Sequence, residues 1–295
     1  SAFVTEALII CRLVIEEMDK NAEILQKIDE IIKSNYVFLS KLMNKGELSQ
    51  IGDNDSGRLF YSAFDEDYPL KMDWLFEIIR NLYQKSEFYH EEEKFTRKIK
   101  SETPSFDNFQ QVTHKKIKLF TKDYGFYSFE DFGIYVWRND NEYFSIRCGP
   151  IGQNGIGGHS HYDQLSIECF TGDYWIARDP GTGTYTDDIE TRNKFRSLYY
   201  HWGPNTEIKF PNEDEFDCFK LNHMSDGEVL QFDKNNFLGF ANFAGKRIYR
   251  KITINEGEVS IEDFSNDVEL EEYTSWGEQN NGIKVKFSNG YKRIS

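Results

Sequence analysis

The sequence predicts an α+β protein in which a helical segment is followed by an antiparallel β-sandwich. Two observations carry this prediction. Apolar residues recur at helical spacing in the first hundred residues, and they alternate in short β-rich runs after about residue 106. The chain has 295 residues, of which 39% are hydrophobic and 16% aromatic, so it can bury a sizeable core without disulfide bonds.

The helical pattern occupies two stretches. Residues 3–45 repeat apolar side chains at helical spacing, which predicts two or three helices. Residues 52–57 (GDNDSG) have the composition of a turn, and helix-like periodicity resumes over residues 70–100, before Pro104. We therefore expect the first hundred residues to be mainly helical.

The β-rich part begins near residue 105, where the periodicity changes. Its strand-like runs are short and are bounded by Gly, Asn and Asp, as is typical of an antiparallel sandwich. We predict strands at residues 132–138, 143–148, 164–170, 174–178, 237–243, 246–254 and 259–263.

Charge and cysteine content narrow the classes of function. A net charge of −15 argues against nonspecific nucleic-acid binding, but an anionic sugar responds to the local field of a cleft. No apolar run approaches the roughly 20 residues that span a bilayer. The four cysteines form no CxxC pair, so we expect buried apolar thiols rather than a thiolate zinc site: Cys11, Cys148, Cys169 and Cys218.

The stretch most suggestive of chemistry is residues 155–163 (GIGGHSHYD), which contains two of the six histidines. On an extended segment, side chains two positions apart share a face, so His159 and His161 can address one cavity while Ser160 points away. Neutral imidazole is a common zinc ligand, and a zinc site needs three or four donors. Further donors must come from elsewhere in the chain.

Two later residues are candidate donors. A hairpin closed by residues 171–173 would return Asp179 to the His161 end of the preceding strand. His201 follows among aromatic residues. Each signal also has an ordinary interpretation: HxH pairs often face solvent, DPG is a common turn, and the cluster Arg192, Lys194 and Arg196 is typical of a solvated face.

Order and spacing together resemble the heparinase II/III-like family of polysaccharide lyases. The family's sandwich carries Gly-His-x-His-x-Asp, then Asp-Pro-Gly-Thr, then Arg-Asn-x-Phe-Arg-Ser and a nearby His. This chain has GHSHYD at 158–163, DPGT at 179–182, RNKFRS at 192–197 and His201. The stretch at 51–58 also looks like a loop near the end of the family's α/α-toroid.

The resemblance implies a ligand set and a fold. It implies that zinc is bound by His161, Asp179 and His201, and that His159 faces the substrate as a catalytic residue. Residues 1–105 would be the C-terminal part of an α/α-toroid, and residues 106–295 a heparinase-type sandwich. The implied activity is β-elimination on an acidic, uronic-acid-containing polysaccharide, with Arg192 and Arg196 as candidate contacts to the anionic sugar.

The resemblance is incomplete in two places. The family commonly reads His-Asn-Thr where this chain reads HWGPNT at 201–206. The toroid residues that act on the sugar in the family, an Asn or His and a Tyr, have no counterpart that we can assign here, so we expect this segment alone to be inactive. We expect the zinc to be structural, fixing His159 in the cleft.

Two other classes remain open. Cupin-like metal enzymes also carry HxH on a β-scaffold, but they place a Glu three or four residues later. Here the first Glu is Glu168, on the opposite face of a regular strand from His161. The second alternative is a noncatalytic carbohydrate-binding sandwich, in which aromatic residues stack on sugars.

Overall fold

A computed structural model of the chain describes residues 2–53, 59, 71–84, 97–98, 104–206, 217–222, 224–255 and 257–271. The chain divides into two compact units, which are described separately below. One comprises Ser1–Ser49 and Asp55–Glu93, and the other comprises Gln50–Asn54 and Lys94–Ser295. The short segment Gln50–Asn54, although surrounded in sequence by the first unit, thus belongs with the second. The predicted α+β class is confirmed.

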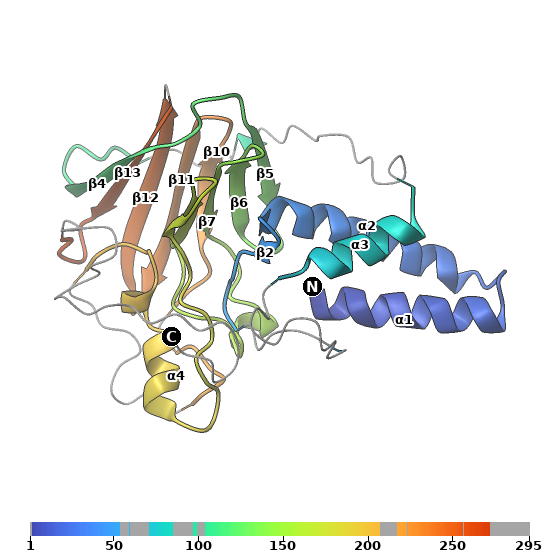
Figure 1. The fold of residues 1–295 in the computed structure, drawn as a ribbon. Coiled ribbons are helices and arrows are strands. Elements are labelled where there is room, and N and C mark those ends of the chain that lie inside the picture. The colour runs from blue at the N-terminus through green and yellow to red at the C-terminus, as the bar shows by residue number, and fades with distance from the viewer. Residues whose placement is uncertain are drawn as a thin grey trace. The chain divides into compact units, whose positions relative to one another are not determined.

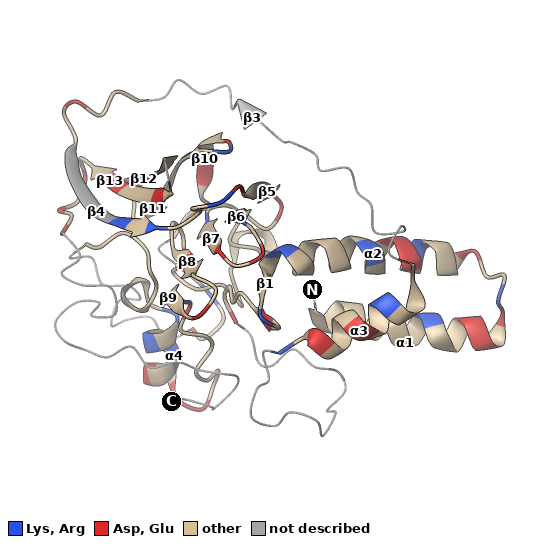
Figure 2. Cartoon of the chain, turned by 45° about the horizontal axis from the view of Figure 1, so that its top comes forward, with Lys and Arg blue, Asp and Glu red and all other residues tan. Residues whose placement is uncertain are grey.

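The first unit is helical. Its helices are α1 (Ala2–Met18), α2 (Ile24–Leu42) and α3 (Asp73–Leu82), and a short hairpin joins β1 (Met43–Asn44) to β2 (Glu47–Leu48). Buried side chains include Ile32, Leu39, Leu75 and Ile79. Acidic and basic residues both occur along the helices (Figure 2).

The helical prediction holds in part. Residues 3–45 do form two helices, α1 and α2. Among the described residues of the second predicted stretch, 71–84 and 97–98, helix is found in α3 alone, and Arg97–Lys98 form strand β3 instead. Residues 85–96 lie outside the described part of the chain. Among the described residues no helix is long and apolar enough to cross a bilayer.

The second unit contains two antiparallel sheets among its described residues. The six-stranded sheet has the order β3-β10-β11-β12-β13-β4, and the five-stranded sheet the order β5-β6-β7-β8-β9. The first consists of β3 (Arg97–Lys98), β10 (Glu228–Phe232), β11 (Asn236–Phe243), β12 (Lys246–Asn255), β13 (Glu258–Ser265) and β4 (Gln110–Lys118). The second consists of β5 (Gly125–Phe129), β6 (Ile134–Arg138), β7 (Tyr143–Arg147), β8 (Ile167–Phe170) and β9 (Trp175–Ala177).

The two sheets share one hydrophobic core. Trp137 and Phe144 of the five-stranded sheet belong to the same buried cluster as Phe237, Ile252 and Ile261 of the six-stranded sheet. Along β12, buried and less buried positions alternate, as a strand with one face on the core requires. The strands of the two sheets run beside each other in Figure 1. The predicted β-sandwich is therefore confirmed.

The predicted strands correspond to β6, β7, β8, β9, β11, β12 and β13, with ends that differ by up to three residues. The largest difference is at β8, which begins at Ile167 and not at residue 164. Leu165 has φ +63°, outside the extended region, so the strand cannot begin before it. Strands β1, β2, β3, β4, β5 and β10 were not predicted from the sequence, and neither was helix α4 (Ile189–Phe195).

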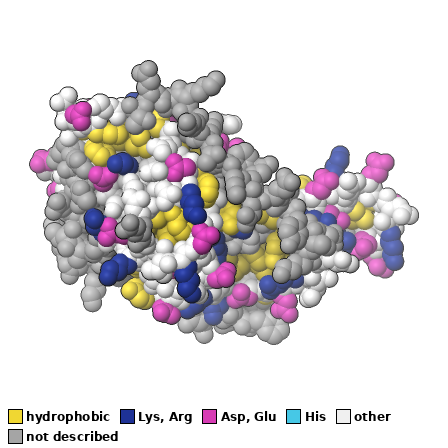
Figure 3. All heavy atoms as spheres, turned by 90° about the horizontal axis from the view of Figure 1, so that it is seen from above, with side chains coloured by type: hydrophobic (Ala, Val, Ile, Leu, Met, Phe, Trp, Pro, Cys, Tyr) yellow, Lys and Arg dark blue, Asp and Glu magenta, His cyan; other side chains and the backbone are white. Residues whose placement is uncertain are grey.

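Charged groups on the surface are mixed in sign. On the face shown in Figure 3, the described Lys and Arg side chains lie among Asp and Glu and between small apolar areas. Neither sign forms a continuous patch on that face. A field suited to an anionic polymer would have to come from a local arrangement of charges.

Candidate metal and catalytic site

The two histidines of the HxH stretch lie in the loop that precedes β8, and they differ in exposure. The His161 side chain is fully buried, whereas that of His159 is 60% exposed. Both rings contact the same carboxylate: His161 Nε2 lies 2.9 Å from Asp53 Oδ1, and His159 Nδ1 lies 3.1 Å from Asp53 Oδ2. The stretch is not a strand, but its two imidazoles do converge on one place, as predicted.

Asp179 reaches the site through the predicted hairpin. Strands β8 and β9 pair antiparallel, and the backbone N–H of Thr171 donates to the carbonyl of Tyr174 at 3.1 Å. Asp179 follows β9 and is buried; its backbone N–H donates to Glu168 at 3.2 Å, and its Oδ1 accepts from the N–H of Gly181 at 2.8 Å. The DPG turn therefore fixes the direction of the Asp179 carboxylate.

His201 follows the short 3-10 helix η3 (Leu198–Tyr200) and packs directly on His161. The two rings are stacked, with centroids 5.1 Å apart and an interplanar angle of 14°. His161 Nδ1 lies 3.2 Å from His201 Nε2, and His201 Nδ1 lies 3.9 Å from Asp179 Oδ2. The structure thus brings together the three residues that the sequence analysis proposed as metal ligands.

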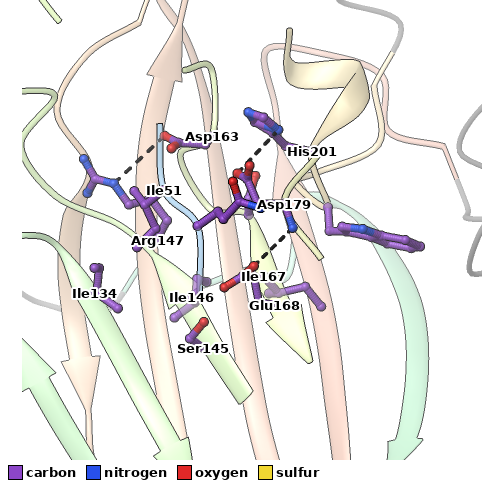
Figure 4. A pocket seen from close by; sticks show the side chains of 13 residues that line it. Ile51, Ile134, Ser145, Ile146, Arg147, Asp163, Ile167, Glu168, Asp179 and His201 are labelled. Carbon is purple, nitrogen blue, oxygen red and sulfur yellow. Dashed lines mark hydrogen bonds and ion pairs between the residues drawn. The ribbon is translucent and has the colours of Figure 1, made fainter. Parts of the chain in front are cut away.

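The three side chains lie close enough together to share one metal ion. One ligand atom from each of His161, Asp179 and His201 can be chosen so that all lie within 4.8 Å of one another. Zinc–nitrogen bonds of about 2.0–2.1 Å in a tetrahedron place neighbouring donors about 3.3 Å apart, close to the observed separation of the two imidazole nitrogens. Two imidazoles and a carboxylate are also ligands that zinc accepts. Figure 4 shows Asp179 and His201 side by side.

Burial makes the charged forms of these ligands unfavourable in the absence of a cation. Burial, and next the neighbouring carboxylate of Glu168, raise the pKa of Asp179 well above its ordinary value. Burial, and next His161, lower the pKa of His201 well below its ordinary value. A neutral imidazole is the ligand form, and a divalent cation would supply the positive charge that a buried carboxylate needs. The residues present therefore fit a zinc ion.

Asp53 is the site residue that the sequence analysis missed. Its side chain is 1% exposed, and it pairs with Arg192, whose Nη2 donates to Oδ2 at 2.8 Å and whose Nη1 donates to Oδ1. Burial opposes ionisation of Asp53, but hydrogen bonds and charge from His161 and Arg192 hold its pKa below the ordinary value. The GDNDSG turn had been noted only as a loop, and its separation of more than a hundred positions from His161 gave no signal of contact.

Helix α4 places two arginines inside the protein. Asp188 caps the helix by accepting from the N–H of Glu190 at 3.0 Å, and Arg192 and Arg196, one turn apart, are both fully buried. Besides Asp53, Arg192 binds the carbonyl of Cys218, and Arg196 binds the carbonyls of residues 217, 218 and 220. The solvated-face interpretation is wrong for both arginines. Both side chains hold the loop at residues 217–220, and their contact with an anionic sugar stays a prediction.

A buried ion pair anchors the loops that carry the candidate ligands. Arg250 of β12 and Asp263 of β13 form a bidentate pair with both N···O distances at 2.8 Å, and neither side chain is more than 1% exposed. The same guanidinium donates to the carbonyls of Leu165 and Trp202. Trp202 adjoins His201, and Leu165 lies in the loop after His161. Arg250 therefore ties both ligand loops to the six-stranded sheet.

A small cavity adjoins the metal-ligand group. It offers about 20 Å³ of space to water, which is enough for one molecule. Asp179 and His201 line it, together with Glu168, and Arg147 and Asp163 face each other across 3.9 Å on its wall (Figure 4). Burial raises the pKa of Asp163, and Arg147 opposes this rise. The cavity is too small for a sugar.

The exposed side of His159 is aromatic. The His159 ring lies 6.0 Å from that of Tyr185 and 5.8 Å from that of Phe219, and the latter two rings are 5.9 Å apart. Phe219 is 38% exposed. The guanidinium of Arg192 lies 5.5 Å from the Tyr185 ring centroid. An exposed imidazole therefore stands among aromatic faces, above a buried group of metal donors.

Comparison with known proteins agrees with the motif resemblance. Residues 121–202 match the family described as Heparinase II/III-like, C-terminal. The match includes all of the histidines, the aspartate and the arginines that the sequence analysis selected. The resemblance to this family is thus confirmed for this segment. A search of curated proteins finds no match.

Three solved structures are similar to parts of the chain. A heparinase III with methylated lysines is 14% identical, with a TM-score of 0.39, and the match covers 59% of this chain and 32% of that one. Another heparinase III is 16% identical, with a TM-score of 0.36 and coverages of 50% and 25%. Heparan sulfate lyase HepC from Pedobacter heparinus is 12% identical, with a TM-score of 0.45 and coverages of 89% and 37%. The matches span between a quarter and two fifths of these longer chains.

Proposed function

We propose, from the heparinase II/III-like character of residues 121–202, that this chain is the zinc-bearing sandwich part of a polysaccharide lyase that cleaves an acidic, uronic-acid-containing polymer by β-elimination. One observation carries the proposal. Within the matched segment, the exposed His159 is joined through the carboxylate of Asp53 to the buried His161, which belongs to a group of metal donors. The imidazole of His159 is thus held beside the buried group of metal donors.

Zinc would be held by His161, Asp179 and His201. These residues come from three separate segments: the loop before β8, the turn after β9 and the end of η3. A bound zinc ion would hold these segments together and supply positive charge in the interior. His159, two positions from one ligand, is thereby kept in place for contact with substrate. This is a structural role for the metal.

The reaction needs a base for the proton on C5 of the uronic acid and an acid for the leaving oxygen on C4. We assign the removal of the C5 proton to His159, the candidate catalytic residue, whose side chain is open to solvent. The electron pair of the C5–H bond forms a C4=C5 double bond, and the C4–O bond breaks with its pair going to oxygen. That oxygen takes a proton from an acid, which we propose to lie in the toroid.

Tyr185 and Phe219 offer aromatic faces beside His159 on which sugar rings can pack. Arg192 and Arg196 support this surface from within by holding the loop that carries Phe219. The role we assign to them is positioning. Specificity for an acidic sugar would need cationic groups beyond these two buried arginines.

The helical unit is consistent with part of a larger helical domain. Helix α1 exposes several large apolar side chains: Phe3, Val4, Leu13, Val14 and Met18. Helices that are apolar on several sides normally pack against further helices. An α/α-toroid would provide them, together with the sugar-binding Asn or His and Tyr.

The second candidate is a noncatalytic sugar-binding module, which the aromatic faces at His159 favour. One experiment separates the two. The protein at its natural length, loaded with zinc, is incubated with a panel of acidic polysaccharides, and the ultraviolet absorbance of unsaturated uronate ends is followed. A lyase generates this absorbance, and His159→Ala abolishes it while retaining zinc. A panel that is bound but never cleaved would reject the lyase and support the binding module.

A further inference from the structure

Asp53 is bound on every side by groups that also define the candidate site. Its carboxylate contacts His159, His161 and Arg192, and its backbone N–H donates to the carbonyl of His159 at 2.8 Å. Its side chain is 1% exposed. One buried carboxylate therefore touches both the proposed catalytic imidazole and a proposed zinc ligand.

Gly52, the residue before Asp53, allows the backbone to approach the HxH loop closely. Gly52 has φ +63°, and a Cβ there would lie 2.4 Å from the carbonyl oxygen of His159. Only glycine allows the backbone to approach the HxH loop so closely. The segment Gln50–Asn54 belongs to the sandwich unit, although the residues on both sides of it belong to the helical unit.

The carboxylate acts as a hydrogen-bond acceptor. Arg192 holds it in a two-pronged pair, and a guanidinium is always protonated, so its partner is the ionised carboxylate. An ionised carboxylate only accepts. An imidazole nitrogen bonds to it only when that nitrogen carries a hydrogen, as Nδ1 of His159 and Nε2 of His161 then do. Nη1 of Arg192 also lies near Nε2 of His161, at 3.3 Å, but the carboxylate is closer, at 2.9 Å, and we take it as the partner of that nitrogen.

We propose that Asp53 is a positioning residue that sets the tautomers of both imidazoles, so that His161 turns a bare Nδ1 toward the metal and His159 turns a bare Nε2 toward the substrate. The part that concerns His159 rests on the proposed function. The part that concerns His161 rests only on the metal-ligand geometry.

For His161 the two ring nitrogens have separate tasks. Nδ1 is the atom that lies 3.2 Å from His201 Nε2, inside the ligand group, and Nε2 is the atom bound to Asp53. A carboxylate behind a ligating histidine fixes the ring and raises its basicity, and loss of such a partner typically costs roughly 10–100-fold in metal affinity. We expect a loss of this size for Asp53→Asn.

For His159, the hydrogen bond from Nδ1 to Asp53 leaves Nε2 as the proton acceptor. With hydrogen on Nδ1, the lone pair is on Nε2, the nitrogen not bound to Asp53, on a ring that is 60% exposed. A proton from C5 of a uronic acid would go to this lone pair. The adjacent carboxylate would then stabilise the imidazolium, as a buried aspartate does for a catalytic histidine.

The test is the tautomeric state of the ring nitrogens, read from long-range 1H–15N spectra of the full chain labelled with 15N-histidine. His159→Gln and His161→Gln identify the two sets of signals. The metal-free chain should show hydrogen on Nδ1 of His159 and on Nε2 of His161, and zinc should leave the His159 state unchanged. Hydrogen on Nε2 of His159 in the parent chain would overturn the proposal for that ring.

Asp53→Asn sharpens the test, because an amide replaces one accepting oxygen with an N–H donor. At least one of the two rings must then reverse its tautomer, and zinc affinity, measured by competition with a chromophoric chelator, should fall roughly 10–100-fold. Asp123→Asn, at an exposed aspartate, is the matched control and should change neither. If Asp53→Asn does not fold with Arg192 unpaired, the double variant Asp53→Asn/Arg192→Met removes that buried charge. Unchanged tautomers and zinc affinity in a folded variant would refute the role of Asp53.

These readouts do not depend on lyase activity. If the tautomers are as expected but no polysaccharide is cleaved, the proposed function fails and the positioning role of Asp53 stands. If cleavage is found but the tautomers are reversed, the function stands and the role of Asp53 fails.

Discussion

Replacing Arg250 with Ala tests whether a single buried guanidinium holds the ligand loops in place. The substitution leaves the Asp263 carboxylate buried without its partner and removes the donor from the carbonyls of Leu165 and Trp202. Breaking a buried pair by removing one partner costs about 3–5 kcal/mol. For a unit of this size, each kcal/mol corresponds to roughly 2–4 °C in Tm. We therefore expect a decrease in Tm of roughly 6–20 °C.

The assay is denaturant and thermal unfolding followed by circular dichroism, with zinc affinity measured on the same samples. Zinc affinity should fall as well, because the two carbonyls belong to the loops around His161 and His201. The double variant Arg250→Leu/Asp263→Leu removes both charges and should recover much of the stability. An unfolding free energy for Arg250→Ala within about 1 kcal/mol of the parent would refute this reasoning, since only a surface-like pair is worth so little.

Three further predictions follow from burial and metal binding. Phe237→Ala, in the fully buried core, should lower the free energy of unfolding by about 3–5 kcal/mol, whereas Phe132→Ala, at a half-exposed position, should change it by less than about 1 kcal/mol; denaturant titration would measure both. The expectation of a buried thiol is wrong for Cys11, which is exposed, so a maleimide should label it in the native protein. The same reagent should reach Cys148 and Cys169 only after unfolding, because both are buried and burial raises the pKa of Cys148 to about 12. Labelling of either buried thiol in the native protein, seen by mass spectrometry of the labelled peptides, would contradict this. Removal of zinc by a chelator should lower Tm, and restored zinc should return it; an identical melting curve with and without metal would contradict a structural ion.

The sandwich and its hairpin could be predicted because short-range patterns specify them. Alternating apolar residues along β12 and the close turn between β8 and β9 are local signals, and the hairpin alone returned Asp179 toward His161. Strand β4 was missed because its sequence, QQVTHKKIK, is mostly polar. Helix α4 was missed because it is only seven residues long, too short for a clear helical period.

The site was predictable where its residues follow one another within a motif and unpredictable where distant segments meet. His161, Asp179 and His201 lie within about forty positions of each other and are carried by recognisable patterns. Asp53 reaches the same place from a distant turn, so nothing near His161 in sequence indicated it. The arginines of α4 were misjudged because a basic cluster usually faces solvent, whereas here an ionised carboxylate and backbone carbonyls satisfy two of them in the interior.

Metal content tests the central claim most directly. The purified chain is passed over a chelating resin, reloaded with excess zinc, desalted and measured by plasma mass spectrometry, beside His161→Ala and His159→Ala. The account predicts near-stoichiometric zinc in the parent and in His159→Ala, and loss of zinc in His161→Ala together with a lower Tm. A folded parent that retains no zinc, or a His161→Ala variant that retains all of it, would contradict the metal site on which the proposed function depends.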